Sequence, residues 1–344
     1  MRRETHRDGG KSPLTLRIGV IGCGSISRRH MEASTRLDYV EIMAASSRAS
    51  TSLDEVSGDY GISHLFTDWR ELVQCDVVDA VLICLPDGLH EEVTVGAARQ
   101  GKHVLVEKPM SRTLSESESM VAAAADADVV LMVAQSTRQV DSHKHARRLV
   151  QDGSIGTIVS AVRRRHGNVI DTVRDKTWYT DPKMSRDLLL YGLGSHEYDA
   201  MLWLLESEAE EVLAEGRKDP AIWPGWISIE STLKMRTGIT CRVSMSAQSG
   251  EPHGDTVIEG SKGSMLITQN RLTIDGRDVE LPWDAVATFA AQLGEFAECV
   301  RTGCEPGPSG RNVQATMAVL EGLHESLQCG GQVELAEIGV KWHG

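Results

Sequence analysis

The stretch LRIGVIGCGSIS, residues 16 to 27, decides the fold because it changes from one local pattern to another within a few residues. It begins as an apolar run broken by glycines, as expected of a buried strand that ends in a tight turn. The residues after the turn share one face of a predicted helix: Ile26, His30, Ala33 and Leu37. The order strand, tight turn and helix is that of a βαβ unit.

The glycines of this turn have the spacing of a dinucleotide-binding fingerprint, Gly22-x-Gly24-x-x-Ser27. Gly22 would allow the tight turn, and Gly24 would let a pyrophosphate approach the backbone. The amino end of the helix, with Ser25 and Ile26, would offer unpaired N–H groups to the same anion. Ser27 departs from the usual small third residue, and a glycine turn without a ligand is the alternative. We expect this turn to bind a dinucleotide cofactor.

Length and composition predict a two-domain globular protein, since 344 residues with 41% apolar and 25% charged side chains exceed one ordinary core. The net charge of −13 argues against a nucleic-acid partner. The seven cysteines are scattered and never spaced C-x-x-C, which argues for reduced thiols and against a metal site. No apolar run is long enough for a signal or a membrane span, so we expect a cytoplasmic protein with no membrane partner.

The pattern of apolar residues predicts a domain boundary. Residues 1–13 are polar and turn-rich, which predicts a disordered tail. Near-continuous apolar runs alternating with helical segments then predict a parallel sheet covered on both faces, with strands at 40–45, 78–84, 102–106 and 129–134. We therefore predict a Rossmann dinucleotide-binding domain over 14–135 and a second, α+β domain over 136–344.

The second half of the chain alternates apolar and polar residues with a period of two. Residues 226–235 and 239–246 show this alternation on either side of a short turn, which predicts a hairpin with one face in water. Short strands continue at 255–260, 264–268, 271–275 and 278–281, so the expected fold is a mainly antiparallel, open-faced sheet flanked by helices. Two closing helices carry the apolar stripes Phe289, Leu293, Phe296, Val300 and Val313, Met317, Leu320, Leu327.

The end of the second predicted strand bears on the choice of cofactor. NAD-binding units usually place an acidic residue there to pair the ribose hydroxyls. This chain instead reads AASSRAS, and Ser46, Ser47 and Arg48 would suit a 2′-phosphate. NADP is therefore favoured over NAD, while an exposed loop arginine is the alternative.

A second charged motif follows the strand in VLVEKPM, residues 104 to 110. Pro109 disfavours a helical conformation of Lys108, so the lysine should be extended at the carboxyl end of its strand. From these residues alone a solvated loop lysine is the simpler interpretation.

Together these motifs resemble the Gfo/Idh/MocA family of glucose-fructose oxidoreductase and inositol dehydrogenase-like enzymes. The resemblance rests on the turn at 22–27, P-x-x-x-H at 86–90, GKHVLVEKP at 101–109 and the closing string LEGLHESLQCGGQVEL, and it extends from about residue 15 to 335. It implies a catalytic Lys108 that reaches both nicotinamide and substrate, with Glu107 orienting the lysine. It also implies further cofactor contacts from Cys84, Leu85, Pro86, His90 and Glu107.

The resemblance also implies a second group of site residues. His196 would be the general base and Asp199 its neighbour on one helical face. Residues of the substrate pocket would include Arg138, Trp178, Tyr179 and Tyr191. The open face of the second sheet, around Ser228, Glu230 and Thr232, would form a homodimer or homotetramer, or else be solvated.

The chain departs from the family pattern at two places. Gly192 stands where the family has an aspartate, and Arg186-Asp187-Leu188 stands where it usually has glycines. Tyr191 or Asp187 could substitute for the missing carboxylate, although helical spacing places neither at position 192. The resemblance implies an NAD(P)-dependent dehydrogenase or reductase acting on a ring carbon of a sugar, sugar phosphate, amino sugar or cyclitol. A catalytically inactive NAD(P)-binding sensor and an NAD-dependent glycosidase are the alternatives.

Overall fold

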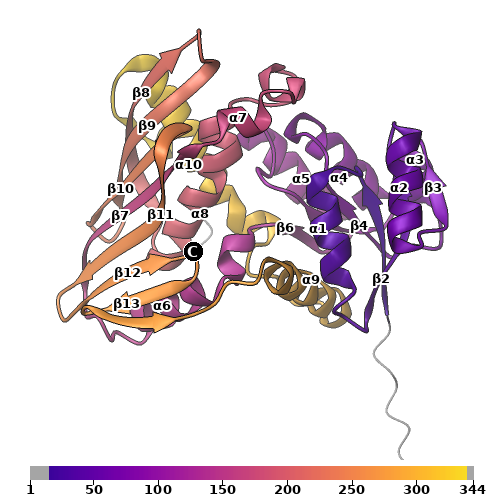
Figure 1. Ribbon diagram of the computed structural model, residues 1–344, viewed down its shortest axis with the longest axis horizontal. Coiled ribbons are helices and arrows are strands. Elements are labelled where there is room, and N and C mark those ends of the chain that lie inside the picture. The colour runs from indigo at the N-terminus through magenta and orange to yellow at the C-terminus, as the bar shows by residue number, and fades with distance from the viewer. Residues whose placement is uncertain (1–14, 339–344) are drawn as a thin grey trace, which may run out of the picture.

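The computed structural model describes residues 15–338 and contains two sheets, one in each half of the molecule (Figure 1). A parallel sheet with helices on its two faces forms one half, and a larger sheet with helices on one side forms the other. This confirms the predicted Rossmann fold followed by an open-faced, mainly antiparallel sheet. The predicted tail at residues 1–13 lies outside the described residues.

The first sheet is parallel throughout, with the strand order β3-β2-β1-β4-β5-β6. Its strands are β1 (Leu16–Ile21), β2 (Val40–Ser46), β3 (His64–Phe66), β4 (Ala80–Ile83), β5 (His103–Val106) and β6 (Leu131–Val133). The order reverses between β1 and β4, and ligands of such sheets bind beyond the carboxyl ends of the strands at that point. The short edge strand β3 was not among the predicted strands, because its three residues are too few to show a period.

Helices cover both faces of this sheet. They are α1 (Ser25–Ser34), α2 (Ser50–Tyr60), α3 (Trp69–Gln74), α4 (His90–Arg99) and α5 (Leu114–Asp126). The start of α5 is fixed by a capping box, in which the Thr113 side chain accepts from the Glu116 N–H and the Glu116 carboxylate accepts from the Thr113 N–H. The loop from Glu107 to Thr113 is therefore held at both ends, by β5 and by this cap.

The second sheet has nine strands in the order β14-β13-β12-β11-β7-β10-β9-β8-β15. Neighbouring strands are antiparallel except β7 and β10. The strands are β7 (Ile158–Asn168), β8 (Ala209–Asp219), β9 (Trp223–Met235), β10 (Thr240–Ser246), β11 (Gln248–Gly260), β12 (Ser264–Thr268), β13 (Arg271–Ile274), β14 (Arg277–Glu280) and β15 (Val333–Glu334). The predicted alternation holds, since the apolar positions of β9 and β10 are buried while Glu230 and Arg242 are exposed.

The remaining helices connect the two halves. They are α6 (Asp141–Gln151), α7 (Ile170–Val173), α8 (Gly194–Leu205), α9 (Ala285–Thr302) and α10 (Gly310–Cys329), with a π-helical segment, Leu188–Leu193, leading directly into α8. The helices α6, α8 and α10 contact the second sheet, and α10 also contacts α5. Two short 3₁₀ turns, Ser136–Gln139 and Thr177–Thr180, lie in the connections before α6 and before the π-helical segment.

Helix α9 follows the second sheet in sequence but packs against α1 of the first half (Figure 1). Phe289, Leu293 and Phe296, which form its predicted apolar stripe, are buried in the same cluster as β1 and α1 side chains. The last part of the chain therefore completes the core of the cofactor-binding half, and the two halves share covering helices.

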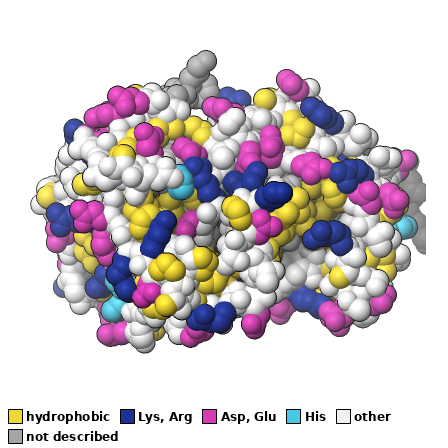
Figure 2. Space-filling model, turned by 90° about the horizontal axis from the view of Figure 1, so that it is seen from above, with side chains coloured by type: hydrophobic (Ala, Val, Ile, Leu, Met, Phe, Trp, Pro, Cys, Tyr) yellow, Lys and Arg dark blue, Asp and Glu magenta, His cyan; other side chains and the backbone are white. Residues whose placement is uncertain are grey.

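The surface carries side chains of both charges. On the face seen from above, basic side chains gather around apolar ones near the middle of the molecule, between the two halves (Figure 2). Within residues 15–338, every helix is too short or too polar to cross a membrane.

Candidate active site

Lys108 lies beyond the carboxyl end of β5, where the predicted motif places it. Its side chain is partly buried, and its Nζ donates a hydrogen bond of 3.0 Å to the carbonyl oxygen of Gly192. Burial lowers the pKa of the ammonium group, and the nearby carboxylates of Glu107 and Asp87 counteract that shift. The Lys108 side chain thus links the loop after β5 to the π-helical segment that precedes α8.

His196 lies in the first turn of α8 and opens into the same cavity as Lys108. Its Nδ1 is buried and has no hydrogen-bond partner among the described residues. Burial, followed by the positive charges of Lys108, Arg165 and Arg163, lowers the pKa of this imidazole well below its usual range. His196 is therefore neutral near pH 7 and can accept a proton.

The cavity that joins these two side chains has a volume of about 400 Å³. It is lined from both halves of the chain, with Ile26 from α1 on one side and Arg163 from β7 on another. Phe289 and Trp283 also line this cavity. Side chains from distant parts of the chain, Lys108 and His196, thus share one cavity.

Glu107 supports the lysine and faces a histidine. Its carboxylate lies 2.8 Å from His30 Nε2 and accepts from the Lys108 backbone N–H at 3.1 Å. Burial alone would raise the pKa of this carboxyl group, but the contact with His30 and the charge of Lys108 lower it overall. Glu107 is therefore ionised, and its carboxylate is bound to His30 and to the Lys108 backbone N–H, as expected of a residue that orients Lys108.

The turn between β1 and α1 has the geometry that a dinucleotide needs. Gly22 has φ of 97°, and a side chain there would collide with the carbonyl oxygen of Cys84. A Cβ at Gly24 would meet nothing within 4 Å, so the backbone is open to an approaching ligand. No side chain caps the amino end of α1 at Ser25 and Ile26, which leaves its first N–H groups available. These residues fit a pyrophosphate.

Ser27, the departure from the fingerprint, stabilises this turn. Its hydroxyl donates a hydrogen bond of 2.7 Å to the Gly24 carbonyl, and the residue is fully buried. A serine is accommodated at this helix–strand contact because the backbone of the turn itself accepts its hydroxyl proton.

A second cavity, of about 360 Å³, lies at the carboxyl end of β2 and is lined by Ser46, Ser47 and Arg48. Ser46 is buried, Arg48 is exposed, and Ser47 Oγ accepts from the Ala49 N–H at 3.3 Å. Leu85 lines the same space. In a Rossmann sheet the adenosine end of a dinucleotide would lie at this position, beyond the carboxyl end of β2.

The P-x-x-x-H motif holds two loops together. The ring nitrogens of His90 lie 2.9 Å from the Pro109 carbonyl oxygen and 2.8 Å from the Leu85 carbonyl oxygen. Pro86 precedes the 3₁₀ turn Asp87–Leu89 that leads into His90. His90 is thus buried between the loops after β4 and β5. Its contact with the Pro109 carbonyl oxygen helps to position the loop that carries Lys108.

Two predicted substrate residues lie outside the cavity of Lys108 and His196. Arg138 donates from Nε and Nη2 to the two carboxylate oxygens of Asp199, at 2.8 and 2.7 Å. Both side chains are buried, and Asp199 also accepts from the Thr316 hydroxyl at 3.1 Å. Side chains three residues apart lie on one face of a helix, yet the Asp199 carboxylate bonds to Arg138 and Thr316 and has no hydrogen bond to His196 among the described residues.

The predicted aromatic residues are not among the side chains that line the cavity, and Tyr191 belongs to the π-helical segment itself. Tyr191 is fully buried, with the Arg186 guanidinium 4.9 Å from its ring centre. Trp178 and Tyr179 stack with ring centres 3.6 Å apart. A Cβ at Gly192 would lie 3.9 Å from the Tyr179 ring, so Tyr179 lies beside the residue whose carbonyl accepts from Lys108.

Neither side chain considered as a substitute for the missing aspartate lines the cavity of Lys108 and His196. Asp187 caps the π-helical segment by accepting from the Leu189 and Leu190 N–H groups, at 2.9 and 2.8 Å. The Tyr191 hydroxyl is buried and has no partner among the described residues. The Gly192 carbonyl oxygen, and not a carboxylate, is what Lys108 meets at this position.

Sequence reasoning missed the basic residues of β7. Arg163 and Arg165 line the cavity, while Arg164, between them, turns to the other face and pairs with Asp255 at 2.9 Å. Arg163 is buried and pairs with Glu197 of α8. The string RRRH inside an alternating strand was the available signal, since alternation puts at least one of three successive residues on each face of the sheet.

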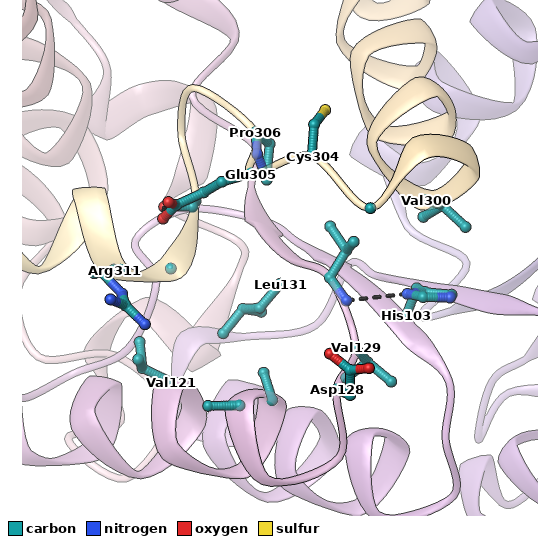
Figure 3. Close-up of a pocket in the computed structure, with 16 residues that line it drawn as sticks. His103, Val121, Asp128, Val129, Leu131, Val300, Cys304, Glu305, Pro306 and Arg311 are labelled. Atoms are coloured by element: carbon teal, nitrogen blue, oxygen red, sulfur yellow. Dashed lines mark hydrogen bonds between the residues drawn. The ribbon is translucent and has the colours of Figure 1, made fainter.

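A larger cavity, of about 530 Å³, lies at the opposite edge of the parallel sheet (Figure 3). His103 and Leu131 border it at the amino ends of β5 and β6, and His103 Nδ1 accepts from the Val130 N–H at 3.0 Å (Figure 3). It is therefore separated by the length of β5 from Lys108. The candidate residues Glu107 and Lys108 lie at the other edge, beyond the carboxyl end of β5.

Comparisons with known proteins agree with this geometry. Residues 16–135 match the oxidoreductase family with an NAD-binding Rossmann fold, and residues 143–266 match the GFO/IDH/MocA C-terminal domain. D-apiose dehydrogenase of Paraburkholderia graminis is 28% identical over 342 residues, covering 93% of this chain and 89% of that protein. The 4-carboxy-2-hydroxymuconate-6-semialdehyde dehydrogenase of a Sphingobium species is 25% identical over 325 residues, covering 91% and 99%.

The fold is shared with solved structures as well. Levoglucosan dehydrogenase in complex with NADH superposes with a TM-score of 0.88 at 20% identity, covering 93% of this chain and 99% of that one. The two family models fall on the two halves of the chain in the expected order. The chain therefore belongs to the Gfo/Idh/MocA family of NAD-binding oxidoreductases.

Proposed function

We propose that the protein transfers hydride between NAD(P) and a ring carbon of a polyol: a sugar, sugar phosphate, amino sugar or cyclitol. The observation that carries this proposal is the shared cavity of Lys108 and His196, beside the open amino end of α1. The similar D-apiose dehydrogenase and levoglucosan dehydrogenase support a carbohydrate substrate.

Lys108 would hold the oxygen of the reacting carbon. A lysine carries three donors, and the Gly192 carbonyl engages one of them at 3.0 Å. The others can stabilise the negative charge that develops on the substrate oxygen, in a site where few water molecules compete. A bound nicotinamide would supply the hydride acceptor or donor.

His196 would take the hydroxyl proton during oxidation and return it during reduction. Its imidazole is neutral because burial and three nearby cations disfavour the protonated form. Asp199 is not available to orient it, because that carboxylate pairs with Arg138. The proton therefore moves between the substrate and an imidazole without an acidic partner.

We propose NADP as the preferred cofactor. The cavity beyond β2 presents serine hydroxyls and Arg48, and no acidic residue ends the strand. Asp68 and Glu92 also border this space, but each lies within ion-pair distance of Arg70, at 3.2 and 2.5 Å. A 2′-phosphate would find an arginine there without an acidic competitor.

We further propose a homodimer or homotetramer assembled through the open face of the second sheet. Exposed polar residues such as Glu230 and Arg242 lie on that face. Light scattering at micromolar concentration tests the assembly, and a monomer would contradict the proposal.

We also propose a cytoplasmic location, which the seven unpaired cysteines support.

A panel of sugars and cyclitols, with NAD and NADP, tests the function by the absorbance of the reduced nicotinamide. Lys108→Met is expected to lower kcat by about two to four orders of magnitude while cofactor binding is kept. Lys262→Met, which removes an exposed lysine outside the cavity, is the matched control. Turnover of the panel by Lys108→Met at the normal rate would contradict the assignment.

A cofactor-binding sensor without catalysis is the second candidate, because Gly192 offers no carboxylate beside Lys108. It predicts measurable nucleotide binding with no net oxidation or reduction of any substrate. An NAD-dependent glycosidase would instead cleave glycosides while retaining its cofactor without net redox turnover.

A further inference from the structure

We infer that the substrate carries an anionic group, a carboxylate or a phosphate, which Arg165 receives opposite the reacting carbon. This inference deepens the proposed function and rests on it, because it assigns the substrate to the same cavity. The inference narrows the proposed substrates from polyols in general to polyols that carry an acidic group.

The cavity is basic although the protein is acidic. The protein has a net charge of −13, yet the charged residues lining this cavity include more cations than carboxylates. The cations are Arg29, Lys108, Arg163 and Arg165, and the carboxylates are Glu107 and Glu197. A concave site enclosed by low-dielectric walls strengthens such an excess, so its potential favours an anion.

Both carboxylates are already engaged. Glu107 faces His30 and the Lys108 backbone N–H, and Glu197 pairs with Arg163 inside the protein. The histidines do not add charge of their own, since burial and the charge of Arg163 lower the pKa of His143 to about 3. Four cations against two carboxylates therefore leave an excess of two positive charges in the cavity, and Arg163 is already paired with Glu197.

Arg165 is the cation placed to meet a ligand. Its side chain is 46% exposed, and its one ion-pair contact among the described residues joins its Nε to Glu197 Oε1 at 3.7 Å. Glu197 is held more closely by Arg163, so Arg165 keeps most of its donors free. A planar guanidinium with free donors binds carboxylate or phosphate through two parallel hydrogen bonds.

The sheet leaves room for that ligand. Gly254 of β11 is paired directly with Arg165 across the strands and also lines the cavity. A Cβ at Gly254 would lie 3.4 Å from Arg165 Nη1, so any larger residue would fill the space beside the guanidinium. The glycine therefore leaves Arg165 open toward the cavity.

The positions of the cations in the cavity indicate which of them is available to bind an anionic group. Lys108, beyond β5, is assigned to the oxygen of the reacting carbon, and Arg163 is occupied by Glu197 and by the Thr256 hydroxyl at 2.7 Å. Arg165 enters from β7 of the other half. An acidic polyol that spans the cavity would be held at both ends, which orients its carbon for hydride transfer.

Isothermal titration calorimetry with the NADP-loaded protein tests the inference. The probes are matched pairs in which an acid differs from a neutral sugar by its charged group: D-glucuronate and D-glucose 6-phosphate against D-glucose, and D-galacturonate against D-galactose. At least one acid is expected to bind about 10- to 100-fold more tightly than its neutral partner, as a charged hydrogen-bonded pair would produce. The uronate and phosphate arms then identify which anion is favoured.

Arg165→Gln is expected to remove most of this difference. Arg164→Gln removes the same charge from the adjacent residue, whose side chain is on the other face of β7, and it should preserve the preference. Circular dichroism and thermal melting confirm that both variants are folded. A panel in which no acid binds more tightly than its neutral partner overturns the inference, as does an equal effect of the two variants.

The two proposals can fail separately. Turnover of neutral sugars alone would leave the oxidoreductase assignment standing and overturn the anionic substrate. Tight acid binding that depends on Arg165, without turnover of any substrate, would support the anion site and count against the catalytic role.

Discussion

Replacing Asp199 by alanine is expected to lower the free energy of unfolding by about 3 to 5 kcal/mol. The substitution removes both carboxylate acceptors of Arg138, at 2.8 and 2.7 Å, while the arginine side chain is only 9% exposed. The Gly307 carbonyl, at 2.9 Å, would be the remaining acceptor of that guanidinium. A charge left buried with one neutral partner accounts for most of the loss.

Urea denaturation followed by tryptophan fluorescence measures this change, and an unaltered slope with denaturant would show that the folded core is otherwise the same. The double variant Arg138→Met with Asp199→Leu removes both charges together. Its expected cost is smaller, about 1 to 3 kcal/mol, because only the Gly307 carbonyl and the Thr316 hydroxyl lose partners.

The same variants separate a structural ion pair from a substrate site. If the pair were part of the substrate site, Asp199→Ala would raise KM strongly and leave the urea midpoint unchanged. That result would refute the placement of Asp199 away from His196. Recovery of both stability and kcat/KM in the double variant would support it.

Three further outcomes are expected. Arg48→Ala should weaken NADP binding by about tenfold or more and leave NAD binding nearly unchanged, and equal losses measured by fluorescence titration would contradict the 2′-phosphate assignment. Because the pKa of His196 lies well below 6.5, the imidazole stays unprotonated as pH falls through that value, so kcat/KM for oxidation should show no inflection there. Gly22→Ala should abolish measurable cofactor binding, because it forces a side chain into the Cys84 carbonyl and into positive φ, and normal titration would refute this.

The local patterns of the chain were sufficient to predict its fold class and most strands of the parallel sheet, although β3 was missed. The glycine turn after β1 and the period-two runs of β9 and β10 follow from short-range rules on turns and burial. The family resemblance added Lys108 and His196, which the structure then brings to one cavity. The fold prediction is confirmed because it depends on residues close together in sequence, while the catalytic roles of Lys108 and His196 stay predictions.

The remaining features depend on contacts between distant residues. Arg138 and Asp199 are 61 positions apart, and nothing in either local segment indicates that they pair. The exposure of Arg165 depends on the register that sets it beside Gly254. Helical spacing alone also suggested that His196 and Asp199 share a face, whereas their actual partners lie on different elements.

The return of α9 to the first half has a consequence for how the protein can be divided. Phe289, Leu293 and Phe296 fill the core beside α1, so a fragment that stops after the dinucleotide-binding segment would leave that apolar surface uncovered in water. A chimera that uses the nucleotide-binding half is therefore expected to need a helix encoded about 150 residues downstream to cover this surface.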